Sequence, residues 1–156
     1  MSAALHPLLV PVAGWLGAWS GSGTGEYPTI NPFGYAETFT LGHAGKPLMA
    51  YSQRTTAADD GRALHAESGY WRMVDHGRCE LVIAHGSGHV EVATGTWESH
   101  RLEVRSVGVI GAPSSKSVVE ISRVFVRDAE TISYDLAIAA VDQPLLPHLH
   151  AELHRA

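Results

Sequence analysis

The stretch GAWSGSGTGEYPTI, Gly17 to Ile30, decides how the first part of the chain folds. Its glycines occupy odd positions only, at 17, 21, 23 and 25. Side chains of an extended strand alternate between its two faces, so one face is nearly bare backbone between Trp19 and Tyr27. A bare strand face is typical of a barrel corner, or of a close approach by a ligand or a second backbone. The segment alone favours the corner, because every tightly coiled sheet needs bends and few bends bind ligands.

The glycine run does not match a phosphate-binding loop. It contains no GxxxxGK[ST], and it reads G-x-G-x-G where the dinucleotide fingerprint reads G-x-G-x-x-G. Pro28 follows the run, whereas the fingerprint opens an apolar helix. A nucleotide site at this segment is therefore excluded.

The composition limits the size and the partners of the protein. A chain of 156 residues that is 45% hydrophobic predicts one domain, residues 1–156, with a core of its own. The formal charge is −5, and the 11 Lys and Arg residues form no basic run. These features argue against nucleic acid or an anionic membrane as the main partner.

The N-terminus and the single cysteine give hints about location. The first residues lack the basic start of a signal peptide, and Pro7 and Pro11 interrupt a segment too short to span a bilayer. We expect a short helical plug that packs on the domain through Leu8, Leu9, Val12 and Leu16. Cys79 is the only cysteine, which excludes an intramolecular disulfide and fits a reducing, cytoplasmic location.

From Tyr35 onward the chain alternates strand-like runs with turn clusters. The runs are rich in Val, Ile, Thr, Tyr and Leu, and no later segment has the length and period of a helix. A meander of this many strands is best accommodated by closure, which removes exposed edges. We predict an all-β fold, a closed antiparallel up-and-down barrel of about eight to ten strands with room for one small ligand. The glycine segment is its first strand, and the other candidates are 36–42, 47–55, 64–74, 79–85, 89–97, 101–109, 117–127, 131–141 and 148–155.

The opening stretch is similar to the G-x-W-x-G-x-G-x-G-x-Y-P-x-I signature of the nitrobindin family. The resemblance implies a ten-stranded barrel like that of lipocalins and fatty-acid-binding proteins. It also implies a ferric b-type haem that isomerises peroxynitrite to nitrate and binds nitric oxide reversibly. The likeness continues over most of the chain, through NPFGYAETFTLGHAGKPLMAYSQRT (31–55), LHAESGYWR (64–72), SSKSVVEISRVF (114–125) and QPLLPHLHAELHR (143–155).

The same resemblance implies three residues that hold the haem. The family's single axial histidine falls on His148, the threonine of its Y-P-T element on Thr29, and a lysine near the haem on Lys116. Residue chemistry leaves a simpler alternative for two of them. Thr29 can be a turn hydroxyl that satisfies backbone groups, and Lys116 can be a solvated loop cation.

Strand alternation raises a difficulty for His148. It places His148 and His150 on the face opposite Leu149, and a barrel normally turns its leucine face inward. Pro144 and Pro147 mark the entry of this strand as irregular, and a bulge there could aim His148 at a pocket. His150 is the rival ligand, and the two alone are too few for a zinc site. No spacing assigns a role to His43, His65, His76, His85, His89, His100 or His154.

Two other functions remain open at this point. One is a nitric oxide carrier or sensor that uses the same haem without turnover. The other is a lipocalin-like carrier of an apolar molecule, for which Arg123 and Arg127 could clamp a carboxylate, although the pattern favours exposed pairs that also involve Tyr134. A leucine face of the last strand, if it lay at the surface, would allow a homodimer.

Overall fold

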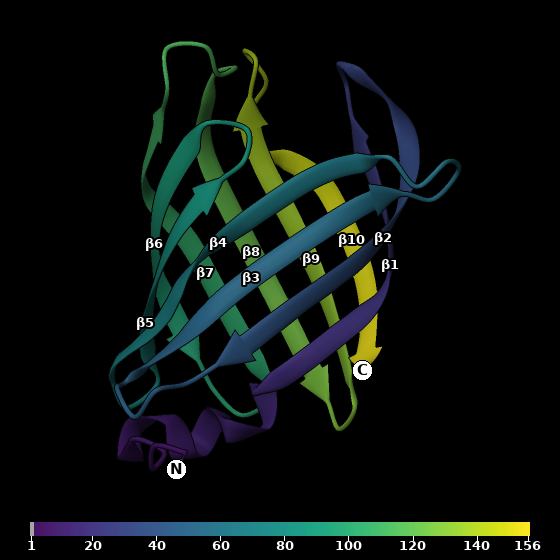
Figure 1. Ribbon diagram of the computed structural model, residues 1–156. Helices are drawn as coiled ribbons and strands as arrows, with labels where there is room; N and C mark the ends of the chain where they lie inside the picture. The colour runs from purple at the N-terminus through teal and green to yellow at the C-terminus, as the bar shows by residue number, and fades with distance from the viewer. Residues whose placement is uncertain (1) are drawn as a thin grey trace.

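The computed structural model describes residues 2–156 and shows a closed barrel, drawn in Figure 1. Every strand pairs antiparallel with its sequence neighbours, and the first pairs with the last, so the described sheet has no free edge. This confirms the predicted fold; Met1, part of the predicted domain, lies outside the described residues. A short 3₁₀ helix, η1 (Pro7–Trp15), precedes ten strands in residues 2–156: β1 (Gly17–Tyr27), β2 (Ile30–Gly42), β3 (Leu48–Ala57), β4 (Ala63–Asp75), β5 (Arg78–His85), β6 (His89–Trp97), β7 (Arg101–Gly111), β8 (Val118–Asp128), β9 (Thr131–Ala140) and β10 (Leu146–Arg155).

The N-terminal helix closes one end of the barrel, beneath the strands in Figure 1. The side chains of Leu9, Val12 and Trp15 are fully buried. The indole of Trp15 meets those of Trp71 and Trp97 edge to face, with 6.2 Å between ring centroids in each pair. The predicted plug is confirmed, and its tryptophan packs with two tryptophans of the barrel at this end. No helix in residues 2–156 has the length and apolarity to cross a membrane.

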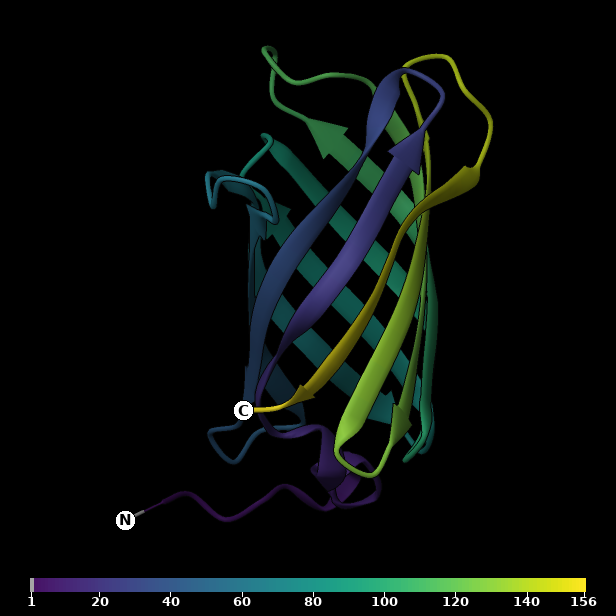
Figure 2. The ribbon, with the colours of Figure 1, turned by 90° about the vertical axis from the view of Figure 1, so that its right-hand side faces the viewer.

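The opposite end of the barrel is open. The loops that join β1 to β2, β3 to β4, β5 to β6, β7 to β8 and β9 to β10 gather there, as Figure 2 shows at the top of the view. A cavity of about 1080 Å³ extends from this mouth into the barrel. Its volume slightly exceeds the roughly 300–1,000 Å³ that is typical of small-molecule and cofactor pockets.

The glycines of β1 serve a close approach of a second backbone. A Cβ atom on Gly21 would lie 2.1 Å from the carbonyl oxygen of Glu152 in β10. A Cβ atom on Gly23 would lie 2.6 Å from the carbonyl oxygen of His150 and 2.4 Å from the ring of Tyr35. None of these three distances leaves room for a Cβ atom. The bare face therefore lets β10 and the aromatic rings of β2 pack directly on the backbone of β1.

Candidate functional site

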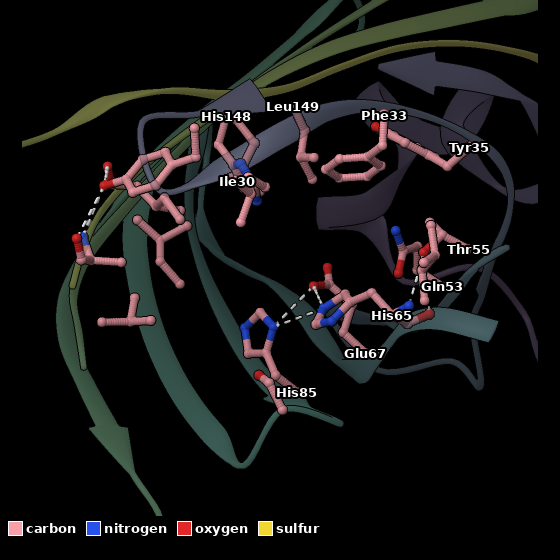
Figure 3. A pocket seen from close by; sticks show the side chains of 18 of the residues that line it. Ile30, Phe33, Tyr35, Gln53, Thr55, His65, Glu67, His85, His148 and Leu149 are labelled. Atoms are coloured by element: carbon pink, nitrogen blue, oxygen red, sulfur yellow. Dashed lines mark hydrogen bonds and ion pairs between the residues drawn. The ribbon is translucent and has the colours of Figure 1, made fainter. Parts of the chain in front are cut away.

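The cavity has two chemically different walls, which Figure 3 shows facing each other. One wall comes from β1, β2 and β10. We call it the aromatic wall, and it consists of Tyr27, Phe33, Tyr35, His148 and Leu149. The other comes from β4, β5 and β8. We call it the charged wall, and it consists of His65, Glu67, His85 and Arg123.

A β-bulge places His148 in the aromatic wall. In the pairing of β10 with β9, Pro147 lies opposite Ala137 and Leu149 opposite Leu136, so His148 is the extra residue. An extra residue in one strand shifts the alternation of side chains by one place. His148 and Leu149 therefore both line the cavity. The bulge predicted from the prolines of this segment is confirmed.

A backbone hydrogen bond fixes the tautomer of His148. Its Nδ1 lies 2.9 Å from the carbonyl oxygen of Glu26. Because a carbonyl oxygen can only accept, Nδ1 carries the proton and donates it, and Nε2 keeps a free electron pair. The rings of Tyr27 and Phe33 pack against the imidazole, with centroids 5.4 and 6.4 Å away. A hydrogen bond of this kind is the usual partner of a metal-ligating histidine.

Beyond the bulge, β10 returns to strict alternation. His150 lies on the outer face, where its Nδ1 is 2.8 Å from the exposed carboxylate of Asp135. Ala151 and Leu153 point inward and are buried. The leucine face that sequence reasoning offered as a dimer surface is therefore inside the barrel, and that basis for a homodimer is wrong.

The other two predicted site residues lie at the open mouth. Thr29 is in the tight turn between β1 and β2, and Lys116 is in the loop between β7 and β8. Both are exposed, and both line the cavity together with His148. The backbone carbonyl of Lys116 accepts a hydrogen bond of 2.7 Å from Nε2 of His89, which ties this loop to β6.

The charged wall depends on the register of two strands. Glu67 of β4 lies directly opposite His85 of β5, and His65 precedes Glu67 by two residues on the same face. Oε2 of Glu67, Nε2 of His65 and Nδ1 of His85 are each 3.2 Å from the other two. Glu91 of β6 stands behind this group, with Oε1 2.7 Å from Nε2 of His85.

Arg123 joins the two buried carboxylates. Its guanidinium donates to Oε1 of Glu67 at 2.7 Å and also to Glu91. Burial would raise the pKa of Glu67, but the charge of Arg123 and hydrogen bonds from the histidines hold it well below its ordinary value. Burial likewise opposes the protonation of His85, but its hydrogen bonds to Glu67 and Glu91 overcome this and raise its pKa to about 9. Glu67, Glu91 and Arg123 therefore form a buried ion network, and His65 is its partly exposed member.

A chain of hydroxyl groups leads from the aromatic wall to Glu37 inside the barrel. The hydroxyls of Tyr35 and Tyr134 are 2.7 Å apart, and Tyr134 donates to the carboxylate of Glu37. Burial raises the pKa of Glu37 to about 7, although Tyr134 and Gln53 partly stabilise its charge. This carboxyl group therefore titrates near neutral pH.

These positions correct two expectations from the sequence. Arg123 and Tyr134 are buried and bonded to carboxylates inside the barrel, so their assignment to exposed pairs is wrong. Arg127 donates to the backbone carbonyls of Ser99 and Ala129. Since Arg123 is already paired, it is not a free cation for the carboxylate of an apolar ligand.

Sequence reasoning assigned no role to His65 and His85. The alternation His65-x-Glu67 places both side chains on one face of a strand, which is a usable signal. It does not reveal that the face points inward or that His85 lies opposite. The lone thiol of Cys79 is buried, as expected, and burial raises its pKa to about 12.

The comparisons with known proteins identify the family. The family model described as "THAP4-like, heme-binding beta-barrel domain" matches residues 8–155. The chain belongs to the nitrobindin family.

The names of several relatives of this chain state a function. "Peroxynitrite isomerase 1" of Mycolicibacterium paratuberculosis is 46% identical, over 97% of this chain and 96% of its own. "Peroxynitrite isomerase 1" of Mycobacterium tuberculosis is 43% identical, over 99% of each. The crystal structure of Rv2717c from M. tuberculosis superposes with a TM-score of 0.92 at 41% identity, covering 98% of this chain and 99% of that one.

Proposed function

We propose that His148 is the axial ligand of a ferric haem b in the cavity, and that the loaded protein isomerises peroxynitrite to nitrate. The bulge at His148 carries this proposal. It turns one imidazole into a cavity wall of aromatic rings, with Nδ1 bonded to the Glu26 carbonyl and Nε2 free. A single imidazole of this tautomer is a suitable proximal ligand, and the cavity volume suits a large planar cofactor.

The chain's own groups would position the cofactor. The hydrogen bond to Glu26 and the packing of Tyr27 and Phe33 restrict rotation of the His148 ring, so that Nε2 keeps one direction. When bound, ferric haem supplies the iron at which peroxynitrite can rearrange. The work of the protein would be to hold that iron by one side chain among the aromatic rings of its wall, with the opposite side of the cavity left open to a small anion.

Thr29 and Lys116 would bind the haem carboxylates. Both are exposed at the mouth, where two carboxylates of a haem can remain hydrated while its ring is buried. The ammonium of Lys116 would pair with one carboxylate, and the hydroxyl of Thr29 would donate to one. We propose further that residues 1–156 act as one haem-binding domain.

Titration with hemin tests the axial ligand. We expect a saturable one-to-one Soret band for the wild-type protein, and its loss or a broad shift in His148→Ala. His150→Ala is the matched control, because this histidine lies two residues along and faces outward; its spectrum should equal that of the wild type. An unchanged spectrum in His148→Ala would overturn the assignment.

The reaction is tested next by stopped-flow decay of peroxynitrite with measurement of the nitrate yield. The haem-loaded wild type should accelerate decay and raise the nitrate fraction, and the haem-free protein and His148→Ala should not. Reversible nitric oxide binding without accelerated decay would contradict the isomerase activity and would instead support a carrier or sensor.

A further inference from the structure

We propose that His65, Glu67 and His85 form a binding site for one divalent first-row transition-metal ion on the charged wall. The three side chains line the cavity opposite His148, as Figure 3 shows. None of these three residues is among those proposed to hold the haem, so the metal site can be tested separately from the haem site.

The spacing of the donor atoms fits such an ion. The three atoms form a triangle with sides of 3.2 Å. Ligand bonds of about 2.0–2.2 Å at angles between octahedral and tetrahedral require donor atoms separated by roughly 2.8–3.6 Å. Two imidazoles and one carboxylate on one side of an ion leave its other positions open, in this case toward the cavity.

The strands hold the triangle in place without help from a loop. Glu67 and His85 are direct partners across β4 and β5, and His65 lies two residues before Glu67 on the same strand face. All three positions belong to strands of the barrel, and His65 lies at the irregularity in the pairing of β4 with β3. Donor groups on rigid elements need little ordering when an ion binds.

Neighbouring residues orient two of the three ligands. Oε1 of Glu67 accepts from Arg123 at 2.7 Å and from the hydroxyl of Tyr51 at 2.9 Å, which directs Oε2 toward the histidines. Nε2 of His85 faces Oε1 of Glu91 at 2.7 Å, which leaves Nδ1 to face the triangle. A carboxylate behind a ligating imidazole is the common outer partner of a protein metal site.

The triangle lies beside two buried carboxylates that share one guanidinium. Arg123 of β8 pairs with Glu67 of β4 and with Glu91 of β6. Oε2 of Glu91 is buried without a hydrogen-bond donor among the described residues. Histidines bind a metal ion in their neutral form, so one carboxylate charge remains in the loaded site for the ion to offset.

Calorimetric titration of the full chain with ZnCl₂ tests the site, first without haem and then with haem bound. We expect one equivalent to bind, with affinity lowered at least about 10-fold in His65→Ala. His65 is chosen because its side chain is 33% exposed and makes no contact with Arg123, so its loss disturbs the ion network least. His150→Ala removes a histidine paired with an exposed carboxylate and serves as the matched control, which should bind as the wild type does.

The alternatives give different results. Equal binding by His65→Ala and the wild type, or no saturable binding of one equivalent, would overturn the site. If His148→Ala loses zinc binding and His65→Ala keeps it, the ion binds at the aromatic wall. This result would also overturn the site on the charged wall, and it would not bear on haem binding. If His65→Ala fails to fold, electron paramagnetic resonance of the Cu²⁺-loaded wild type decides, because coupling to two nitrogens is expected and coupling to none would contradict the assignment.

Discussion

The aromatic and charged walls of the cavity differ in how their functional groups are held. On the aromatic wall, one bulge and one backbone hydrogen bond present a single imidazole among apolar rings. The residues of the charged wall, from β4, β5 and β8, must meet each other and Glu91 of β6 in the correct register before any of them is satisfied. The first arrangement tolerates change around it, whereas the second is a network in which each member depends on the others.

The largest effect is expected from breaking the charged wall. Arg123→Met would leave Glu67 and Glu91 buried without their cation, which should lower the free energy of unfolding by about 3–5 kcal/mol. Arg105→Met is the control, because its partner Glu120 is at the surface and the loss should stay below about 1 kcal/mol. Chemical denaturation measures both, and equal losses would show that the network does not stabilise the fold.

Glu37, which lies between the two walls, should make the free energy of unfolding depend on pH, with an effect of intermediate size. Burial raises its pKa from 4.5 to about 7. Below pH 4.5 the carboxyl group is protonated and neutral in both the folded and the unfolded chain. Between the two values the unfolded chain loses the proton first, so stability falls as pH rises and levels off above about 7.

Glu37→Gln should remove this slope, which amounts to roughly 3 kcal/mol. The free energies of unfolding of wild type and variant, measured between pH 4 and pH 8, give the comparison. Glu103→Gln, at an exposed position, should keep the wild-type slope. A variant of Glu37 with an unchanged slope would show that folding does not raise the pKa of this carboxyl.

A smaller loss of stability is expected from a substitution where the aromatic wall meets the glycine strand, β1. Gly23→Ala would place a methyl group against the Tyr35 ring and the His150 carbonyl, at a cost of about 1–3 kcal/mol. Gly42→Ala is the matched control, because no atom lies within 4 Å of its added Cβ. Thermal unfolding of both variants checks this, and similar stabilities would mean that the bare face is not needed for packing.

The smallest effect should come from the mouth of the cavity. Lys116→Met would remove an exposed cation, so hemin affinity should fall by less than about 10-fold. The fall should shrink in high salt, because exposed charges are screened. Hemin titration at low and high ionic strength measures both, and a loss as large as that of His148→Ala would make Lys116 more than a surface partner.

The sequence by itself determined the barrel and the irregular entry of its last strand. Alternating strands without a helical period predict a closed sheet, and the structure has one. The prolines before His148 indicated an irregular entry, and the bulge lies there. Strand alternation and this bulge are local features, because each depends on residues that are neighbours in the chain. The glycine run by itself favoured a corner, and only the pairing of β1 with β10 shows that its bare face admits a second backbone.

Only the tertiary structure decided the charged wall. A hairpin with unbroken register from Asp75 and Arg78 would place Glu67 opposite Gly86, but the irregularity between Met73 and Asp75 brings it opposite His85. Alternation assigns residues to a face without telling that Glu67 and Arg123 face inward, since charged side chains are usually exposed. Their burial is tolerable only because β8, which is separated in sequence from β4, β5 and β6, brings Arg123 to the carboxylates of Glu67 and Glu91.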